Sequence, residues 1–256
     1  FCSHWHLFRG TPTRSWMEHV LAEVFEVSAP PSAETADALF EEITARLATP
    51  EFRPLALVDR FELEILATTD PASASLEHHA ELARRGWGER IVPTFRPDAL
   101  FHLDREGWTQ DLALLAERAD LEVETYPQFL RALEARRRAF IEAGARASDH
   151  GHLLADTTPL PATEAERIFA AALRREVSSA EASAFSAHML FEMARMSSED
   201  GLTMQLHPGV LRNYDSGVHE ARGADVGYDI PVAAEFTRGL RPLLEAFGHH
   251  ARLRLI

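Results

Sequence analysis

Short apolar segments alternate with amphipathic helical segments from residue 61 to residue 256, and this alternation constrains the fold more than any other feature. Strands are predicted at residues 64–68, 90–95, 145–149, 202–207 and 253–256, with apolar residues at helical spacing between them. Such alternation requires a parallel sheet covered by helices. Polar residues gather at one end of the strands, and no glycine-rich phosphate loop follows the first strand, which favours a barrel over an open sheet.

These patterns predict an α/β fold, a partial (β/α)8 TIM-type barrel. Five strands do not close an eight-stranded barrel, and both ends of the chain look cut, since it starts at Phe1 without a Met and stops at Ile256 inside an apolar segment. Residues 1–60 carry helical patterns only, so we expect an all-helical insertion domain over residues 1–60 and the barrel portion over residues 61–256.

Two kinds of local signal refine the helices. Capping boxes are predicted where Ser15 is followed by Glu18 and where Thr163 is followed by Glu166. One stripe of apolar residues at helical spacing is predicted to face the core rather than a cofactor: Phe185, Met189, Met193 and Met196.

Composition narrows the function. The formal net charge of −14 argues against a nucleic-acid partner, because nothing would neutralise a row of phosphates. All 26 basic residues are arginines, which excludes a Schiff-base lysine, a Walker-type phosphate lysine and a carbamylated-lysine metal bridge. Cys2 is the only cysteine, and no apolar run approaches the roughly 20 residues of a membrane span, so we expect no disulfide framework, no membrane partner and a cytoplasmic setting.

Polar residues follow three of the predicted strands. The segment 201–213 places His207 at the end of a strand, because Pro208 and Gly209 prevent a regular continuation, and Arg212 comes five residues later. Two other strand ends look the same, and they carry Arg96, Asp98, Asp149, His150 and His152. This layout is expected where parallel strands feed loops around a small-molecule site. Asp98 follows Pro97 and is interpreted as the cap of the next segment.

Several segments, in order along the chain, resemble one enzyme family. They are Leu7-Phe8-Arg9-Gly10-Thr11-Pro12, Leu66-Ala67-Thr68-Thr69-Asp70, Pro93-Thr94-Phe95-Arg96-Pro97-Asp98, Ser148-Asp149-His150-Gly151-His152, Glu192-Met193-Ala194-Arg195-Met196, Gln205-Leu206-His207-Pro208-Gly209 and Arg212-Asn213. The family that they resemble is uronate isomerase (glucuronate isomerase), in the amidohydrolase superfamily of metal-dependent barrels. The resemblance implies interconversion of D-glucuronate with D-fructuronate and of D-galacturonate with D-tagaturonate.

The resemblance also implies a divalent metal, with zinc as the expected ion. His207 matches one metal ligand of the family. The family's other ligands, a His-x-His pair on the first strand and an aspartate on the last, are expected before Phe1 and after Ile256. His4-Trp5-His6 has the letters of that pair but lies in the helical region, so it is not assigned to the metal.

Aldose–ketose isomerisation moves a proton between C2 and C1 through an enediol, beside a carboxylate that does not react. It needs a carbonyl polariser, a base and a cation for that carboxylate. Arg96 and Arg212 suit the last task, because a guanidinium binds a carboxylate through two parallel bonds. Asp149 and His207 are assigned as the catalytic residues: His207 as the metal ligand, and Asp149 either as the base or as a group that orients substrate hydroxyls or a water. His150 and Asn213 are further expected substrate contacts.

Two alternatives remain open at this point. The chain could belong to a metal-dependent amidohydrolase or lactonase of the same superfamily, because arginines at strand ends indicate an anionic substrate but do not separate hydrolysis from proton transfer. It could also be a non-catalytic truncated fragment with an incomplete metal site, since a single expected ligand does not bind a metal tightly. For the isomerase we expect a small-molecule sugar acid as the substrate and a homo-oligomer as the assembly.

Overall fold

The computed structural model describes residues 1–256, which separate into two compact units, Phe1–Glu64 and Ile65–Ile256. The sequence pattern predicts this boundary after residue 60. The first unit contains only helices: η1 (Cys2–Phe8), α1 (Pro12–His19), η2 (Val20–Val24), α2 (Ala36–Leu47), η3 (Pro50–Phe52) and α3 (Pro54–Arg60). Its small core is built around Leu21, Val27 and Leu39.

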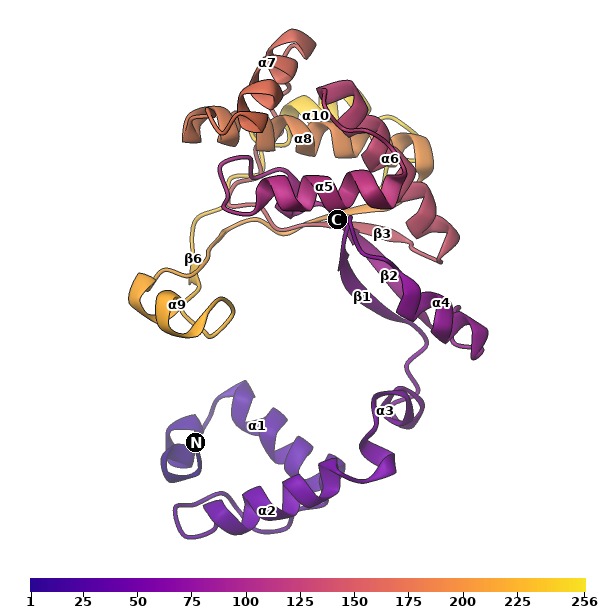
Figure 1. Cartoon of the computed structure of the whole chain (residues 1–256). Helices are drawn as coiled ribbons and strands as arrows, with labels where there is room; N and C mark the ends of the chain where they lie inside the picture. The colour runs from indigo at the N-terminus through magenta and orange to yellow at the C-terminus, as the bar shows by residue number, and fades with distance from the viewer. The chain divides into compact units, whose positions relative to one another are not determined.

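The second unit alternates strands and helices, as the apolar pattern predicted (Figure 1). Its elements are β1 (Leu66–Pro71), α4 (Glu77–Arg84), β2 (Ile91–Arg96), η4 (Asp98–Leu100), α5 (Trp108–Ala119), α6 (Tyr126–Glu142), β3 (Ala147–His150), α7 (Ala162–Leu173), α8 (Ser179–Asp200), β4 (Thr203–Leu206), β5 (Val210–Leu211), α9 (Ser216–Arg222), β6 (Ile230–Pro231) and α10 (Arg241–Phe247). The sheet order is β1-β2-β3-β4, and each neighbouring pair is parallel. The α/β class with a parallel sheet is therefore confirmed.

The C-terminal segment continues this sheet beside β4. Leu255 forms a parallel bridge with Met204, and the main-chain bonds from Met204 N to Arg254 O and from Ile256 N to Met204 O are 2.8 and 2.9 Å long. The sheet does not close on itself, so the closed geometry of a barrel is not present in this chain. A second sheet, the antiparallel pair of β5 and β6, was not predicted; together with α9 it extends away from the main sheet (Figure 1).

The core lies between the sheet and helices α5, α6, α8 and α10, which gather on one side of it (Figure 1). The predicted core stripe on α8 is confirmed, because Phe185, Met189, Met193 and Met196 are at most 1% exposed. Phe169 of α7 stacks on Phe129 of α6 with ring centroids 5.2 Å apart. Burying each such side chain stabilises the fold by about 1.5–3 kcal/mol, so this layer holds the helices against the sheet.

The capping boxes lie at other positions than those predicted. The first long helix begins at Pro12 with Thr11 as its cap, and α7 begins after Pro161 with no side-chain cap, so the boxes at Ser15 and Thr163 were wrong. The boxes that form are Thr125 with Gln128, before α6, and Ser178 with Glu181, before α8. Pro12, at the first helical position of α1, specified that start through its fixed φ more strongly than the box pattern did, and α7 begins directly after Pro161, which is its N-cap residue.

Replacing Ser178 with alanine should lower the free energy of unfolding by about 1 kcal/mol, because the first turn of α8 loses its side-chain acceptor. The hydroxyl and backbone N–H of Ser178 hold the pKa of Glu181 at about 2. A depressed carboxyl pKa stabilises the fold above the unfolded value of about 4.5 and stops doing so as pH falls toward 2. Urea titrations at pH 7 and pH 3 should therefore show a larger effect of the substitution at pH 7; an equal effect at both would contradict it.

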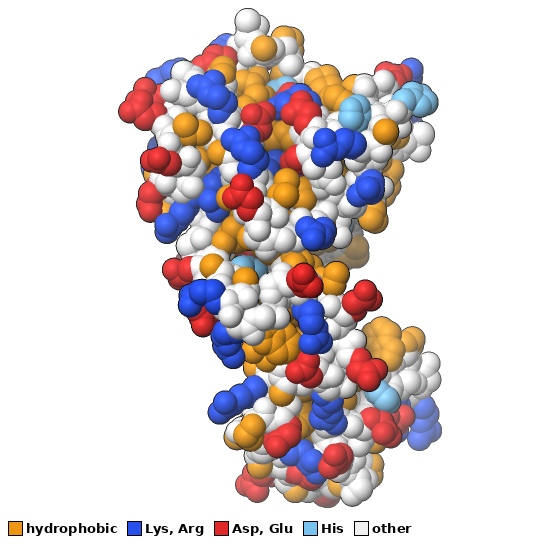
Figure 2. Space-filling model, turned by 90° about the vertical axis from the view of Figure 1, so that its right-hand side faces the viewer, with side chains coloured by type: hydrophobic (Ala, Val, Ile, Leu, Met, Phe, Trp, Pro, Cys, Tyr) orange, Lys and Arg blue, Asp and Glu red, His pale blue; other side chains and the backbone are white.

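Positive and negative charges are mixed on the face of the molecule that Figure 2 shows, where arginine and carboxylate side chains are interspersed. Arg195, for example, bonds to Glu134, Glu192 and Glu199 on α6 and α8. None of the helices combines the length and the apolar character that crossing a membrane requires.

Candidate active site at the carboxyl ends of β2, β3 and β4

Three neighbouring strands bring three of the predicted site residues together. Arg96 is the last residue of β2, Asp149 lies in β3, and His207 directly follows β4. His207 Nε2 lies 2.7 Å from Asp149 Oδ1, and Arg96 Nη1 lies 3.3 Å from Asp149 Oδ2. Parallel strands share their carboxyl edge, which is why residues 53 and 58 positions apart meet here.

The two partners of Asp149 leave this carboxylate polarised but within reach of solvent. The Asp149 side chain is 13% exposed, and the His207 side chain is 49% exposed. Because Nε2 of His207 donates to Asp149, the neutral imidazole keeps a lone pair on Nδ1. The arrangement can therefore pass a proton between Asp149 and a bound molecule, and it offers one nitrogen to a metal.

Asp98 also belongs to this site, although its position after Pro97 predicts a different role. It was interpreted as a helix cap, but no side-chain cap bond is made at η4. Instead its Oδ2 accepts bonds from Arg96 Nε at 3.0 Å and from the backbone N–H of Gly151 at 2.8 Å. The cap interpretation is wrong, because the carboxylate is directed across the strand ends and not along its own short helix. Asp98 fixes the guanidinium of Arg96 on the side away from Asp149.

Burial raises the pKa of the Asp98 carboxyl, but where the imidazoles of His150 and His152 turn N–H groups toward it, they hold that pKa well below its ordinary value. The carboxyl is thus ionised at any pH near neutrality. Arg96 then lies between two carboxylates, Asp98 and Asp149.

His150 faces the opposite side of β3 from Asp149. Successive side chains in a strand alternate between faces, so Ser148 and His150 share one face and Ala147 and Asp149 share the other. His150 is 0% exposed and bonds to Ser148 Oγ at 3.0 Å, and its pKa is lowered by burial. His152 is 5% exposed. The structure does not bring the imidazole of His150 to the solvent face where Asp149 and His207 lie.

Arg212 and Asn213 lie in the segment that connects β5 to β6. Arg212 Nη1 bonds to Asp229 Oδ2 at 2.9 Å, and the backbone N–H of Asn213 donates to Asp229 Oδ1 at 3.0 Å. The guanidinium of Arg212 is paired with this carboxylate and not with Asp149. Arg212 and Asn213 are therefore not part of the contact group formed by Arg96, Asp149 and His207.

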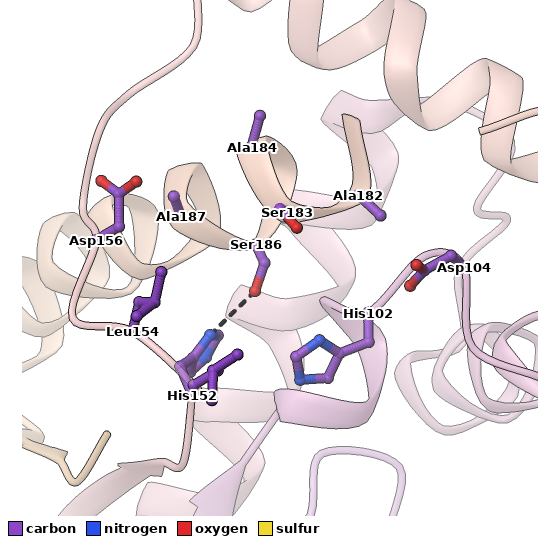
Figure 3. A pocket seen from close by; sticks show the side chains of 11 residues that line it. His102, Asp104, His152, Leu154, Asp156, Ala182, Ser183, Ala184, Ser186 and Ala187 are labelled. Atoms are coloured by element: carbon purple, nitrogen blue, oxygen red, sulfur yellow. Dashed lines mark hydrogen bonds between the residues drawn. The ribbon is translucent and has the colours of Figure 1, made fainter. Parts of the chain in front are cut away.

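A cavity of about 520 Å³ lies close to His152. Figure 3 shows His102, Asp104 and His152 on one side of it and the first turns of α8 on the other, with Ser186 bonded to His152. Arg96, Asp149 and His207 do not line this cavity. The contact group of those three residues combines a carboxylate, a cation and a solvent-exposed imidazole, whereas the cavity is lined by five alanine and leucine side chains and by histidine, aspartate and serine side chains but by no arginine.

The matching family model, described as glucuronate isomerase, covers residues 1–256. The chain is 46% identical to a uronate isomerase of Rhizorhabdus wittichii over 99% of this chain and 54% of that protein. It is 44% identical to a uronate isomerase of Caulobacter vibrioides over 100% of this chain and 53% of that protein.

Solved structures agree with the sequence comparisons. A glucuronate isomerase of Caulobacter crescentus superposes with a TM-score of 0.93 at 43% identity, covering 99% of this chain and 53% of that one. A uronate isomerase of Thermotoga maritima superposes with a TM-score of 0.90 at 31% identity, covering 99% and 56%. The chain thus spans about half the length of the relatives that it matches.

Proposed function

The chain belongs to the glucuronate isomerase family, and from this premise we propose that the protein interconverts an aldose sugar acid, D-glucuronate or D-galacturonate, with the corresponding ketose. The observation that supports the proposal is the contact group of Arg96, Asp149 and His207 at one edge of the sheet. The same group provides the base and the carboxylate-binding cation that an enediol route requires.

Asp149 is the proton-transfer or orienting group of this proposal. Its carboxylate accepts from His207 Nε2 and is neighboured by Arg96. A proton taken from C2 of the aldose would be returned to C1, and the same carboxylate can serve both steps because the reaction is a transfer between adjacent carbons.

Arg96 is proposed to bind the carboxylate of the sugar acid. Its Nε and Nη1 are engaged by Asp98 and Asp149, which holds the guanidinium plane in one orientation. A fixed guanidinium loses little conformational freedom when it binds an anion. Arg212 and Asn213 are also proposed to contact the substrate. This contact requires the segment that contains β5 and β6 to approach the carboxyl ends of β2, β3 and β4.

We propose that His207 binds a divalent metal ion, with zinc as the ion, because the tautomer of its imidazole suits a metal ligand. The Nε2–Asp149 bond fixes the tautomer that leaves the Nδ1 lone pair for a ligand bond. When bound, the ion would polarise the substrate carbonyl. The chain's own contribution is the carboxylate of Asp149, which orients the imidazole of His207 and holds the proton on its Nε2.

We also propose that the sheet is part of a (β/α)8 barrel. Helices α5, α6, α8 and α10 gather on one side of the sheet, as in a barrel wall, whereas open doubly wound sheets carry helices on both faces. The parallel addition of Leu255 beside β4 supports the same proposal.

The test is an assay of the full-length protein with D-glucuronate and D-galacturonate in deuterated water, followed by proton NMR. We expect ketose formation with exchange of the proton at the transferred position. Uronolactones and N-acyl amides are assayed beside the sugar acids. Hydrolysis of either, without isomerisation, would replace the proposal with a metal-dependent hydrolase.

Replacing Gly151 with alanine in the full-length protein should lower kcat/KM about 10-fold, because a small displacement of positioned groups has effects of this order. A Cβ at this position would come within 2.5 Å of Arg96 Nη2 and 2.8 Å of His207 Cε1. The control is Gly217→Ala, whose Cβ meets only Asp215 Oδ1, at 3.5 Å. Steady-state kinetics of both variants check the prediction, and unchanged kinetics in the Gly151 variant would contradict it.

A further inference from the structure

We propose that Asp98, His150 and His152 form a divalent-cation site, best suited to zinc, that is separate from the metal position assigned to His207. It lies on the helix-facing side of β3. Three buried side-chain atoms there have no hydrogen-bond partner, and they are Asp98 Oδ1, His150 Nδ1 and His152 Nε2. All three lie within 4.8 Å of one another.

The spacing fits a metal better than direct hydrogen bonds. Asp98 Oδ1 lies 3.8 Å from His150 Nδ1 and 3.6 Å from His152 Nε2, which is too long for either pair to bond directly. Two ligands that each lie about 2.1 Å from one zinc ion in tetrahedral coordination are about 3.4 Å apart. A shift of a few tenths of an ångström would therefore bring these atoms into coordination distance.

The remaining polar atom of each ligand is already held. His150 Nε2 lies 3.0 Å from Ser148 Oγ, and His152 Nδ1 lies 3.0 Å from Ser186 Oγ. If each outer nitrogen carries the proton, both inner nitrogens present lone pairs toward Asp98 Oδ1. Hydrogen bonds of this kind orient metal-bound histidines in known sites.

The carboxylate of Asp98 is oriented in the same way. Its outer oxygen, Oδ2, accepts from Arg96 and from the backbone of Gly151. Arg96 adds a positive charge near the site, but its guanidinium also contacts Asp149, so that charge is shared between two carboxylates. The inner oxygen remains free to bind a cation.

A cation here would act on structure and not on substrate. The ligand atoms are shielded from solvent, and Ser186 connects His152 to α8 (Figure 3). The ion would join the loop after β2 to the loop after β3, and it would thereby stiffen the Asp98–Arg96 contact at the active site. The proposal does not depend on the isomerase assignment, because its readout is bound metal.

The direct test is crystallography of the full-length protein at the zinc absorption edge. We expect an anomalous peak about 2.1 Å from each of the three atoms. Density for an ordinary water with no anomalous signal would overturn the proposal, because a water bridging the three groups would then account for the unpartnered atoms.

A solution test measures zinc per chain after dialysis of the full-length protein. His152→Asn and Asp98→Asn should each hold one equivalent fewer than the unsubstituted protein. Ser186→Ala, which keeps the three ligands, should weaken zinc binding about 10–100-fold. Equal zinc content in all of these proteins would contradict the proposal.

The matched control is His188→Asn. His188 is buried like His150 and His152, but it lies in α8. Both its ring nitrogens have partners, the Tyr126 hydroxyl at 2.7 Å and the backbone N–H of Leu160 at 3.2 Å. Its substitution should leave the zinc content unchanged.

Circular dichroism of each variant reports folding, and the crystallographic test stands even where a variant does not fold. His207→Asn should remove a different zinc ion from the one held by Asp98, His150 and His152. If His207→Asn left the zinc content unchanged while His152→Asn lowered it, only the metal position proposed at His207 would fail.

Discussion

Replacing Asp149 with asparagine in the full-length protein should lower kcat for uronate isomerisation about 10³-fold, within the range that positioned acid–base groups contribute. The amide keeps the shape of the carboxylate but cannot accept a proton. It also disturbs its neighbours, because one of its two ends presents N–H donors to His207 Nε2 or to Arg96, which are donors themselves. KM should change much less than kcat, since Arg96, the residue proposed to bind the substrate carboxylate, is still present.

The control for this prediction is Asp156→Asn. Asp156 lines the 520 Å³ cavity near His152, and its Oδ1 accepts only from Thr158. Asp156→Asn should keep its kcat within about a factor of two, because it touches none of the three residues of the contact group. The reverse pattern, with Asp156→Asn inactive and Asp149→Asn active, would move the active site into that cavity. Rates are compared by NMR at saturating sugar acid.

The parallel α/β architecture could be predicted because its signal is repeated. Each strand is a short apolar run followed by polar residues, and the order of strands and helices leaves few arrangements for a parallel sheet. The addition of residues 254–256 beside β4 follows from the same pattern. The β5–β6 pair could not be predicted in this way, because its strands, Val210–Leu211 and Ile230–Pro231, are too short to show a period.

The site could be predicted only where it depends on strand ends. Arg96, Asp149 and His207 meet because their strands are parallel and adjacent. Arg212 follows Gly209, whose φ of 101° turns the chain into the segment that contains β5 and β6, and no sequence pattern states where that segment lies. The alternation along β3 was a usable signal for His150: it predicts that His150 and Asp149 face opposite sides. Asp98 had no comparable signal, because the residues that it contacts come from two different strands.

Replacing Asp200 with alanine should lower the free energy of unfolding by about 3–5 kcal/mol, because it leaves a buried guanidinium without its counter-charge. The side chain of Arg137 is 1% exposed, and it bonds to Asp200 through Nε at 2.6 Å and through Nη2 at 2.9 Å. Nη2 also donates to Ser197 Oγ, and the guanidinium lies over the ring of Phe95, 5.5 Å from its centroid. Neither contact supplies a negative charge.

The opposite substitution separates the charge effect from the loss of a contact. Arg137→Met removes the buried charge and fills much of its volume, while the Asp200 side chain, 19% exposed, can be hydrated and still accept from the backbone N–H of Leu202. Arg137→Met should therefore cost about 1–2 kcal/mol, clearly less than Asp200→Ala. Urea unfolding of both variants, and of the double variant, measures the difference. If Asp200→Ala cost no more than Arg137→Met, the guanidinium of Arg137 would have to reach water once its partner is removed, and the α6–α8 contact would be looser than its distances indicate.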